Sequence, residues 1–419
     1  MTSLDEQARA ILRKNDRGGY TVPTDGLYPY QWNWDSAFAA WGFATFDPPR
    51  AWAELETLMA SQWDDGMVPH IIFHKVDPGY FPGPDVWATH RSPPTSGISQ
   101  PPVAATLARL IWEMDTEGGH SHMAALFPKL LRWHRWWHET RCTYGPAAIT
   151  HPWESGRDNC PDWDIGMEGV DGSRAGDYTR RDTGHVDPSM RPRKAEYDRY
   201  IAIVQFGVEV GWDQARIVAE GPFLMADPGI TFILLRAHED LAAIGRALNE
   251  DVTEIEAWAA QLRSALPTIW NPALGAYDAK NLRTGEFANV LGSGAFLAYL
   301  ADASNPELEA HLMRVWDAVT YGIPSADPEA EVFDPRRYWR GPTWPVVNAL
   351  MAIGFRDAGR HDLDARLRRE TVELIQKNGF AEYFDPNDAT PCGGANFTWT
   401  AAIWLTWAGL GLEKAKGAA

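Results

Sequence analysis

Apolar residues recur three and four positions apart through most of the chain, which is the spacing of a helix with one buried face. No segment shows convincing strand alternation, so the pattern predicts an all-α fold. Helices are expected from residues 228 and 253 onward and at about 4–13, 34–46, 49–63, 100–115, 123–141, 196–212, 289–302, 306–319, 342–358, 362–378 and 396–411.

Residues at the starts of three helices support these predictions. Asp227 and Pro228 read as a cap and first turn, and Asn305 followed by proline reads the same way. Thr253 and Glu256 have the spacing of a capping box, which predicts the start of the next helix.

The predicted helices alternate along the chain between an apolar kind and a more charged kind. Inner helices of a double ring are buried on both sides and outer helices on one, so such a ring requires this alternation. Twelve helices would close an (α/α)6 toroid, whereas thirteen candidates are present, and the surplus lies between residues 195 and 290. The apolar helices are 34–46, 100–115, 342–358 and 396–411, and the charged ones are 49–63, 123–141, 306–319 and 362–378.

We expect a single catalytic domain over residues 1–419, with long loops at one end of the toroid. Loop insertions at about 63–99, 142–194 and 320–341 would form a cap over the active site. Aromatic and polar motifs precede several of the apolar helices. Because inner helices of a toroid start at the same end, these motifs should converge on one pit, where helix N-termini present free N–H groups.

Composition narrows the function. The chain holds 21 tryptophans, more than packing requires, and tryptophan also stacks on sugar rings. A net charge of −18 argues against nucleic acid or an anionic membrane as a partner. The three cysteines indicate neither a disulfide framework nor a metal site. Since no apolar run of about 18 residues occurs, and no signal-type block, we expect a cytoplasmic protein. The sequence leaves open whether the protein forms a homo-oligomer.

Two acidic segments carry the candidate chemistry. In the run 153–159 (WESGRDN), a carboxylate occupies a bend next to glycine, with indoles at Trp153 and Trp163. Burial against apolar rings raises a carboxyl pKa, which suits a general acid. Glu382, in the run FAEYF, could supply the base. With no metal or nucleotide motif elsewhere, two such carboxylates indicate glycosidic bond hydrolysis.

Four segments in order resemble the mannosylglycerate and glucosylglycerate hydrolases of glycoside hydrolase family 63, relatives of processing α-glucosidase and trehalase. They are 28–38, 154–159, 338–344 and 382–386, and the resemblance covers roughly residues 20–410. It implies an (α/α)6 barrel, inversion at the anomeric carbon and no obligatory cofactor.

The resemblance also implies residue roles. Asp158 would be the general acid and Glu382 the general base, with their carboxyl groups about 6.5–9.5 Å apart. From the sequence itself, apart from the resemblance, Glu154 would hold the bend, although it could exchange roles with Asp158, and Glu331 and Asp334 are reserve candidates for the base. The sugar would lie against Tyr28, Trp32, Trp34, Asp35, Gln100, Trp153, Gly156, Tyr338, Trp339 and Trp344.

One residue departs from the family pattern beside the proposed acid. Arg157 occupies a position where relatives usually carry a bulky apolar residue. Since a guanidinium next to the acid would lower its pKa, we predict that Arg157 points away from Asp158.

Recognition of glycerate requires a local cation in an otherwise acidic protein. The resemblance assigns this role best to Arg191, with Tyr197 nearby; a solvated loop cation is the alternative. Tyr80, in a proline- and glycine-rich stretch, would close over the pit as a lid, or belong to an ordinary surface loop.

We therefore expect an inverting α-glycosidase that cleaves mannosylglycerate or glucosylglycerate, without a metal or cofactor. Two alternatives remain open at this point. One is a neutral α-glucosidase or trehalase-like hydrolase on the same toroid, and the other is a non-catalytic sugar-binding protein.

Overall fold

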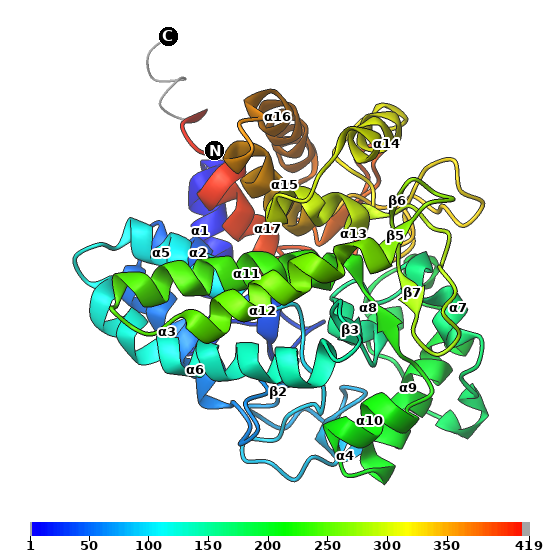
Figure 1. Ribbon diagram of the computed structural model, residues 1–419. Coiled ribbons are helices and arrows are strands. Elements are labelled where there is room, and N and C mark those ends of the chain that lie inside the picture. The colour runs from blue at the N-terminus through cyan, green and yellow to red at the C-terminus, as the bar shows by residue number, and fades with distance from the viewer. Residues whose placement is uncertain (1, 413–419) are drawn as a thin grey trace.

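The computed structural model describes residues 2–412, whose helices are labelled in Figure 1. Their contacts arrange them in an inner and an outer ring. Neighbours in the inner ring contact one another in a closed circuit, from α2 through α5, α11, η6, α15 and α17 back to α2. The inner elements are α2 (Asn33–Ala44), α5 (Ala104–Met114), α11 (Pro228–Ala247), α13 (Ser293–Phe296) with η6 (Leu297–Ala301), α15 (Pro345–Asp357), and α17 (Thr398–Ile403) with η7 (Trp404–Ala408).

The outer helices pack against the inner ring. Along the chain, inner and outer helices alternate. Inner α15 is buried from Pro345 to Phe355, whereas outer α16 buries one stripe and exposes its charged positions. The (α/α)6 prediction and its assignment of apolar helices to the inner ring are confirmed. The outer helices are α1 (Leu4–Asn15), α3 (Pro48–Ala60), α6 (Gly119–Arg141), α12 (Thr253–Ala265), α14 (Pro306–Asp317) and α16 (His361–Asn378).

The surplus helix is α9 (Lys194–Glu209), which packs on η3 (Gly172–Ala175) and α4 (Pro84–Trp87) outside the two rings. It is joined there by several short helical turns. These are α7 (Asp164–Met167), α8 (Asp182–His185), α10 (Gln214–Glu220), η1 (Pro152–Ser155), η2 (Pro161–Trp163), η4 (Pro188–Met190) and, near α12, η5 (Leu266–Ile269).

Two of the three predicted helix caps are confirmed, and the third is wrong. Asp227 caps α11 by accepting a bond from Gly229 N, and Asn305 caps α14, as predicted. The capping box at Thr253 is wrong, because Thr253 already lies inside α12 and Val252 occupies the cap position. Asp251 accepts the Thr253 N–H instead, so an acid two residues earlier performs the expected task.

Very short antiparallel strands tie the loops together. β1 (Gln31–Trp32) pairs with β2 (Ile71–Ile72), which joins the loop before α2 to the loop after α3. The others are β3 (Ala148–Ile149), β4 (Met225–Ala226) and β7 (Lys280–Asn281) in one sheet, β5 (Trp270–Asn271) with β6 (Ala276–Tyr277), and β8 (Tyr383–Phe384) with β9 (Pro391–Cys392).

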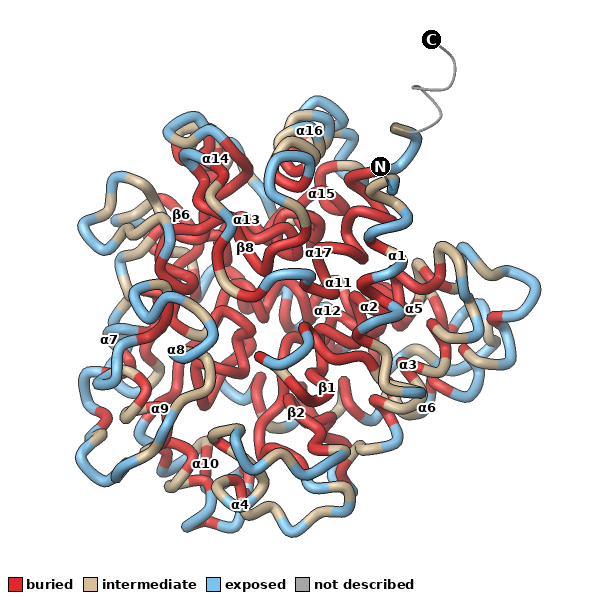
Figure 2. The backbone as a smooth tube through the Cα atoms, turned by 180° about the vertical axis from the view of Figure 1, so that it is seen from behind, coloured by how far each residue is buried: buried red, intermediate tan, exposed pale blue. Residues whose placement is uncertain are grey.

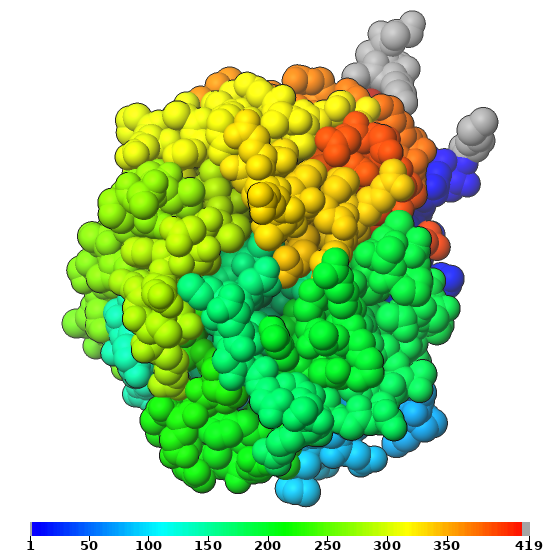
Figure 3. Space-filling model, turned by 90° about the vertical axis from the view of Figure 1, so that its right-hand side faces the viewer, coloured from blue at the N-terminus to red at the C-terminus, as the bar shows by residue number. Residues whose placement is uncertain are grey.

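Buried segments gather in the middle of the molecule, and exposed segments lie at its rim (Figure 2). On the face shown in Figure 3, segments from about 150–200 (teal to green) lie beside segments from about 300–350 (yellow to orange). Within residues 2–412, no helix combines the length and apolar character needed to cross a bilayer.

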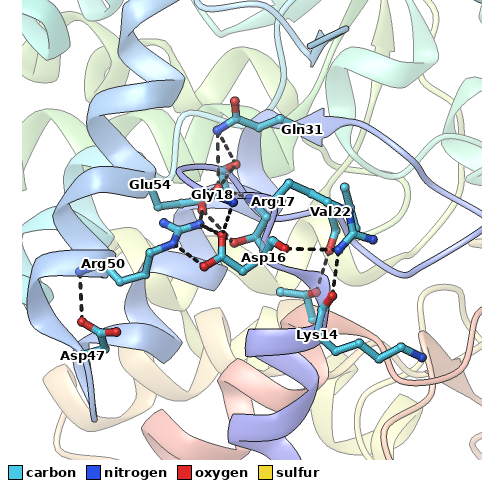
Figure 4. Close-up of polar contacts among 12 residues, drawn as sticks. Lys14, Asp16, Arg17, Gly18, Val22, Gln31, Asp47, Arg50 and Glu54 are labelled. Atoms are coloured by element: carbon cyan, nitrogen blue, oxygen red, sulfur yellow. Dashed lines mark hydrogen bonds and ion pairs between the residues drawn. The ribbon is translucent and has the colours of Figure 1, made fainter. Parts of the chain in front are cut away.

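A buried acidic side chain anchors the segment that leads into α2 (Figure 4). Glu54 of α3 has no exposed surface and accepts bonds from Thr21 N and Oγ1 at 3.0 and 2.7 Å and from Ser36 Oγ at 2.7 Å. Arg50 joins Glu54 to Asp16 at the end of α1. These contacts fix both ends of the segment between α1 and α2 that contributes several residues to the cavity described next.

Candidate active site

A cavity of about 850 Å³, measured with its open mouth, lies where the loops before the inner helices meet. All the residues predicted for the site line it except Trp339 and Trp344. Those brought together are Tyr28, Trp32, Trp34, Asp35, Tyr80, Gln100, Trp153, Gly156, Asp158, Arg191, Tyr197, Tyr338 and Glu382.

Asp158 follows η1 on a tightly packed bend. Gly156 ends that turn with a φ of 67°, and a Cβ there would lie 2.9 Å from both Trp34 Cη2 and Pro101 Cγ. Only glycine combines this backbone conformation with such close approach. Tyr200 of α9 donates to the Asp158 carbonyl at 3.0 Å, so the backbone is held while the side chain borders the cavity.

The environment of Asp158 favours its protonated form. Burial raises the pKa of this carboxyl to about 7; the charges of Glu382 and Asp182 act in the same direction and Arg191 opposes them. A carboxylic acid with such a pKa can hold a proton near neutral pH and donate it.

Glu382 precedes the β8–β9 hairpin and is held by three donors. Tyr28 and Tyr338 each donate a hydroxyl to Oε1 at 3.1 Å, and Gly394 N donates to Oε2 at 2.8 Å. A Cβ on Gly393 would lie 2.2 Å from Oε2, so a side chain there would collide with the carboxylate. Glu382 borders the cavity, but these neighbours leave it no exposed surface.

Glu382 also has a raised pKa. Burial is the main cause, whereas Arg191, the Gly394 amide and the two phenols oppose it by favouring the ionised form. Arg191 Nη1 lies 3.9 Å from Oε1. The two carboxyl groups therefore share one cavity but differ in their surroundings: Glu382 has three hydrogen-bond donors, and among residues 2–412 no side chain donates to the Asp158 carboxyl.

Asp35 lies in the first turn of α2 and faces the same cavity. Burial, followed by the charge of Glu382, raises its pKa well above the usual value. Beside it, Gln100 also lines the cavity, and its Oε1 accepts the Trp34 N–H at 3.3 Å, which holds the amide in place. Polar groups are thus set among the faces of Trp32, Trp34 and Trp153.

The predicted glycerate-binding residues do meet at the cavity, but Arg191 has more partners than the sequence indicated. It donates to Tyr28 Oη at 2.8 Å and to Asp182 Oδ2 at 2.9 Å, and it stacks 3.9 Å above the Tyr338 ring. Its Nη1 is buried without a hydrogen-bond partner in the described chain. Tyr197 and Tyr80 line the same cavity, and Tyr80 packs edge-on against Trp32.

Trp339 and Trp344, which were predicted to lie against the sugar, are set back from the cavity in this structure. Neither lines the cavity; both are buried, and their rings stack on each other with centroids 3.7 Å apart. Trp344 packs behind Tyr338, which takes the surface position in their place. The sequence alone could not show which ring of this motif faces the cavity.

The reserve carboxylates lie elsewhere. Glu154 is fully buried, forms an ion pair with Arg141, and accepts bonds from Thr150 N and Oγ1, so it holds the bend. Asp334 accepts backbone N–H groups of Arg336 and Arg337. Neither Asp334 nor Glu331 lines the cavity.

Several cavity residues were missed by sequence reasoning. Arg180, Arg181 and Asp182 border it, and Asp182 pairs with both Arg180 and Arg191, so its pKa falls to about 2 even though burial acts to raise it. The run of two arginines and an aspartate was a visible signal in a loop otherwise treated as cap. Phe397 and Trp399, at the start of α17, also line the cavity and follow the pattern of motifs before inner helices.

Arg157 points away from Asp158, as predicted. Its guanidinium pairs with Asp227 at 2.7 Å and with Asp162 at 3.3 Å in the protein interior.

Residues 28–400 match the model of the "Mannosylglycerate hydrolase MGH1-like glycoside hydrolase domain". The chain belongs to this family of glycoside hydrolases. It is 43% identical to mannosylglycerate hydrolase MGH1 of Selaginella moellendorffii over 96% of this chain and 85% of that protein. It is 35% identical to glucosylglycerate hydrolase of Mycolicibacterium hassiacum over 97% and 98% of the two chains.

A solved structure gives the same picture of this glycoside hydrolase. The GH63 mannosylglycerate hydrolase from Thermus thermophilus, in complex with Tris and D-glycerate, superposes with a TM-score of 0.92 at 43% identity, covering 97% of this chain and all of that one. The enzyme is thus a glycosidase built on the toroid that its helices form. In residues 2–412, no cluster of three or more His, Cys, Asp or Glu side chains is arranged to hold a metal ion.

Proposed function

We propose that this glycosidase hydrolyses the α-glycosidic bond of a small glycosylated glycerate with inversion, using Asp158 as general acid and Glu382 as general base. The observation that carries the proposal is the meeting of these two carboxyl groups in one aromatic cavity, one without a side-chain donor and one held by three donors.

In this proposal each carboxyl performs one half of the reaction. Asp158, protonated near neutral pH, gives its proton to the glycosidic oxygen as the bond to the anomeric carbon breaks. Glu382 takes a proton from a water that attacks the same carbon from the opposite face, so the product has the inverted configuration.

The aglycone is proposed from charge. Arg191 keeps one buried nitrogen, Nη1, without a hydrogen-bond partner in the described chain, and the phenols of Tyr80 and Tyr197 lie on the same cavity. A substrate carboxylate in the cavity would form a charge-assisted bond with this guanidinium. The relatives' names, and the D-glycerate in the solved structure, support glycerate as the acid.

A substrate panel with NMR detection tests this proposal. Mannosylglycerate and glucosylglycerate are compared with neutral α-disaccharides, and the first anomer released is recorded before mutarotation. We expect turnover of at least one glycerate conjugate with release of the β-sugar. Release of the α-anomer would contradict inversion, and preference for a neutral disaccharide would contradict the glycerate assignment.

We also propose that the enzyme is located in the cytoplasm.

A further inference from the structure

We propose that Arg157 is a positioning residue for Asp158: its buried guanidinium ties the loop that carries Asp158 to the N-termini of the inner helices α11 and α13. The inference rests on the proposed role of Asp158 as general acid. It concerns a residue whose side chain does not reach the cavity.

The guanidinium is bound on both sides inside the protein. Arg157 is 2% exposed; Nη2 donates to Asp227 Oδ1 at 2.7 Å and Nη1 to Asp162 Oδ1 at 3.3 Å. The same Asp227 oxygen accepts the Gly229 N–H at 2.7 Å and so caps α11. One carboxylate oxygen thereby links the start of an inner helix to the loop of Asp158.

Two glycines form the slot that holds the guanidinium. A Cβ on Gly294, in the first turn of α13, would lie 2.6 Å from Arg157 Nη2, and one on Gly229 would lie 3.3 Å from Nε. A side chain at Gly294 would therefore force the guanidinium to move. The backbones of both helices approach the arginine closely because neither carries a side chain there.

Three successive residues of the loop are fixed by three different parts of the fold. Gly156 packs against Trp34 of α2 and Pro101 before α5. Arg157 is bonded to Asp227 at the start of α11 and packs against Gly294 of α13, and the Asp158 carbonyl is held by Tyr200 of α9. The carboxyl of Asp158 receives no side-chain donor from residues 2–412, so its place depends on its backbone. A general acid displaced by about 1 Å can lose on the order of 100-fold in rate.

The test must separate positioning from stability, because removal of one partner from a buried ion pair destabilises a protein. Arg157→Met leaves Asp227 and Asp162 buried without their cation. The double variant Arg157→Met with Asp227→Asn removes one of these charges and keeps a residue that caps helices well. Arg236→Met is a matched control, since Arg236 pairs with Asp240 and Asp357 away from the cavity.

The four proteins to compare with wild type are Arg157→Met, the double variant, Arg236→Met and Asp158→Asn. Their kcat and KM are measured on the glycerate conjugate that wild type cleaves and on the matching α-glycosyl fluoride, at a temperature well below every melting midpoint. Fluoride departs with little help from an acid, so loss of acid catalysis should affect the conjugate far more than the fluoride.

We expect Arg157→Met and the double variant to lose about 10- to 100-fold in kcat on the conjugate, with KM within twofold and a loss on the fluoride of less than about threefold. Arg236→Met should keep wild-type kcat on both. Equal losses on both substrates, a change in KM alone, or full recovery of kcat in the double variant would overturn the positioning role. If wild type does not cleave the fluoride, the conjugate alone tests the role: a loss in kcat with KM within twofold supports positioning, and a change in KM alone contradicts it.

Failure of the underlying assignment has a different signature. If Asp158→Asn keeps most of its activity on the conjugate, Asp158 is not the acid, whatever the Arg157 variants do. If Asp158→Asn shows the selective loss and Arg157→Met does not, only the positioning role falls.

Discussion

The hydroxyl of Tyr28 lies 3.1 Å from Oε1 of Glu382, although 354 residues separate them in the chain. The same Tyr28 oxygen accepts a bond from Arg191 at 2.8 Å, and Arg191 in turn pairs with Asp182. A phenol that accepts from a guanidinium is polarised toward donating its own proton. Tyr28 therefore links the candidate base to the cation of the proposed glycerate site.

Replacement of this phenol should lower the activity, because a smaller fraction of Glu382 is then ionised at a given pH. Tyr28→Phe removes one donor from an ionised carboxylate, a bond of about 1.5–3 kcal/mol, so we expect kcat/KM to fall at least about 10-fold. Since that bond favours the charged form of Glu382, its loss should also move the acidic limb of the pH–rate profile to higher pH. Tyr30→Phe is the matched control, because Tyr30 bonds the Asp77 carbonyl and does not line the cavity. An unmoved acidic limb in Tyr28→Phe would contradict this link.

The wild-type pH profile should be a narrow bell. Glu382 must be ionised and its pKa is raised, so kcat/KM should rise with pH at values above the usual 4.5 for glutamate. Asp158 must be protonated and its pKa is about 7, so activity should fall as pH increases through about 7. Steady-state rates between pH 4 and pH 9 measure both limbs. Activity that stays flat from pH 6 to pH 9 would rule out Asp158 as the titrating acid.

Arg191 should matter most for charged substrates. Its loss removes the partner of the glycerate carboxylate, so Arg191→Ala should raise KM for a glycerate conjugate by about 10-fold or more. The same variant also disturbs Tyr28 and Glu382, which should lower kcat for neutral and charged substrates alike. The ratio of the two KM values isolates recognition of the carboxylate. Equal changes in KM for a neutral glycoside would remove Arg191 from that role.

The buried Glu54 cluster provides a stability prediction. Glu54→Gln keeps the shape of the side chain but takes the negative charge from Arg50 and replaces an acceptor facing Thr21 and Ser36 with a donor. We expect the free energy of unfolding to fall by about 3–5 kcal/mol. Denaturant titration measures this loss. Glu113→Gln, which removes an exposed partner of Arg109, should cost less than about 1 kcal/mol. Similar small losses in both variants would show that Glu54 is not an anchor.

The spacing of apolar residues predicted the two rings because the number of buried faces of a helix determines which of its positions must be apolar. An inner helix such as α15 must be apolar on nearly every face, and an outer one such as α16 only along a stripe, so the alternation was visible in the sequence. The convergence of Trp34, Gln100 and Glu382 followed from the same geometry, since the segments that carry them all meet at the cavity.

Side-chain partners were not predictable in the same way. Arg191 and Asp182 meet because a long loop without hydrophobic periodicity folds back on itself. Trp339, Trp344 and Tyr338 belong to one aromatic motif, and the sequence does not show that only Tyr338 faces the cavity. Arg157 was expected to point away from Asp158, but its partner Asp227 lies 70 residues further on, in another part of the chain. Such pairings depend on tertiary contacts that leave no local signal.

The central claim is that Asp158 and Glu382 divide acid and base catalysis between them. The most direct test is the kcat of Asp158→Asn and Glu382→Gln on a glycerate conjugate, with circular dichroism and melting curves to show that each variant is folded. We predict that each loses at least about 1,000-fold in kcat while keeping the wild-type fold. Activity within 10-fold of wild type in either folded variant would contradict the claim.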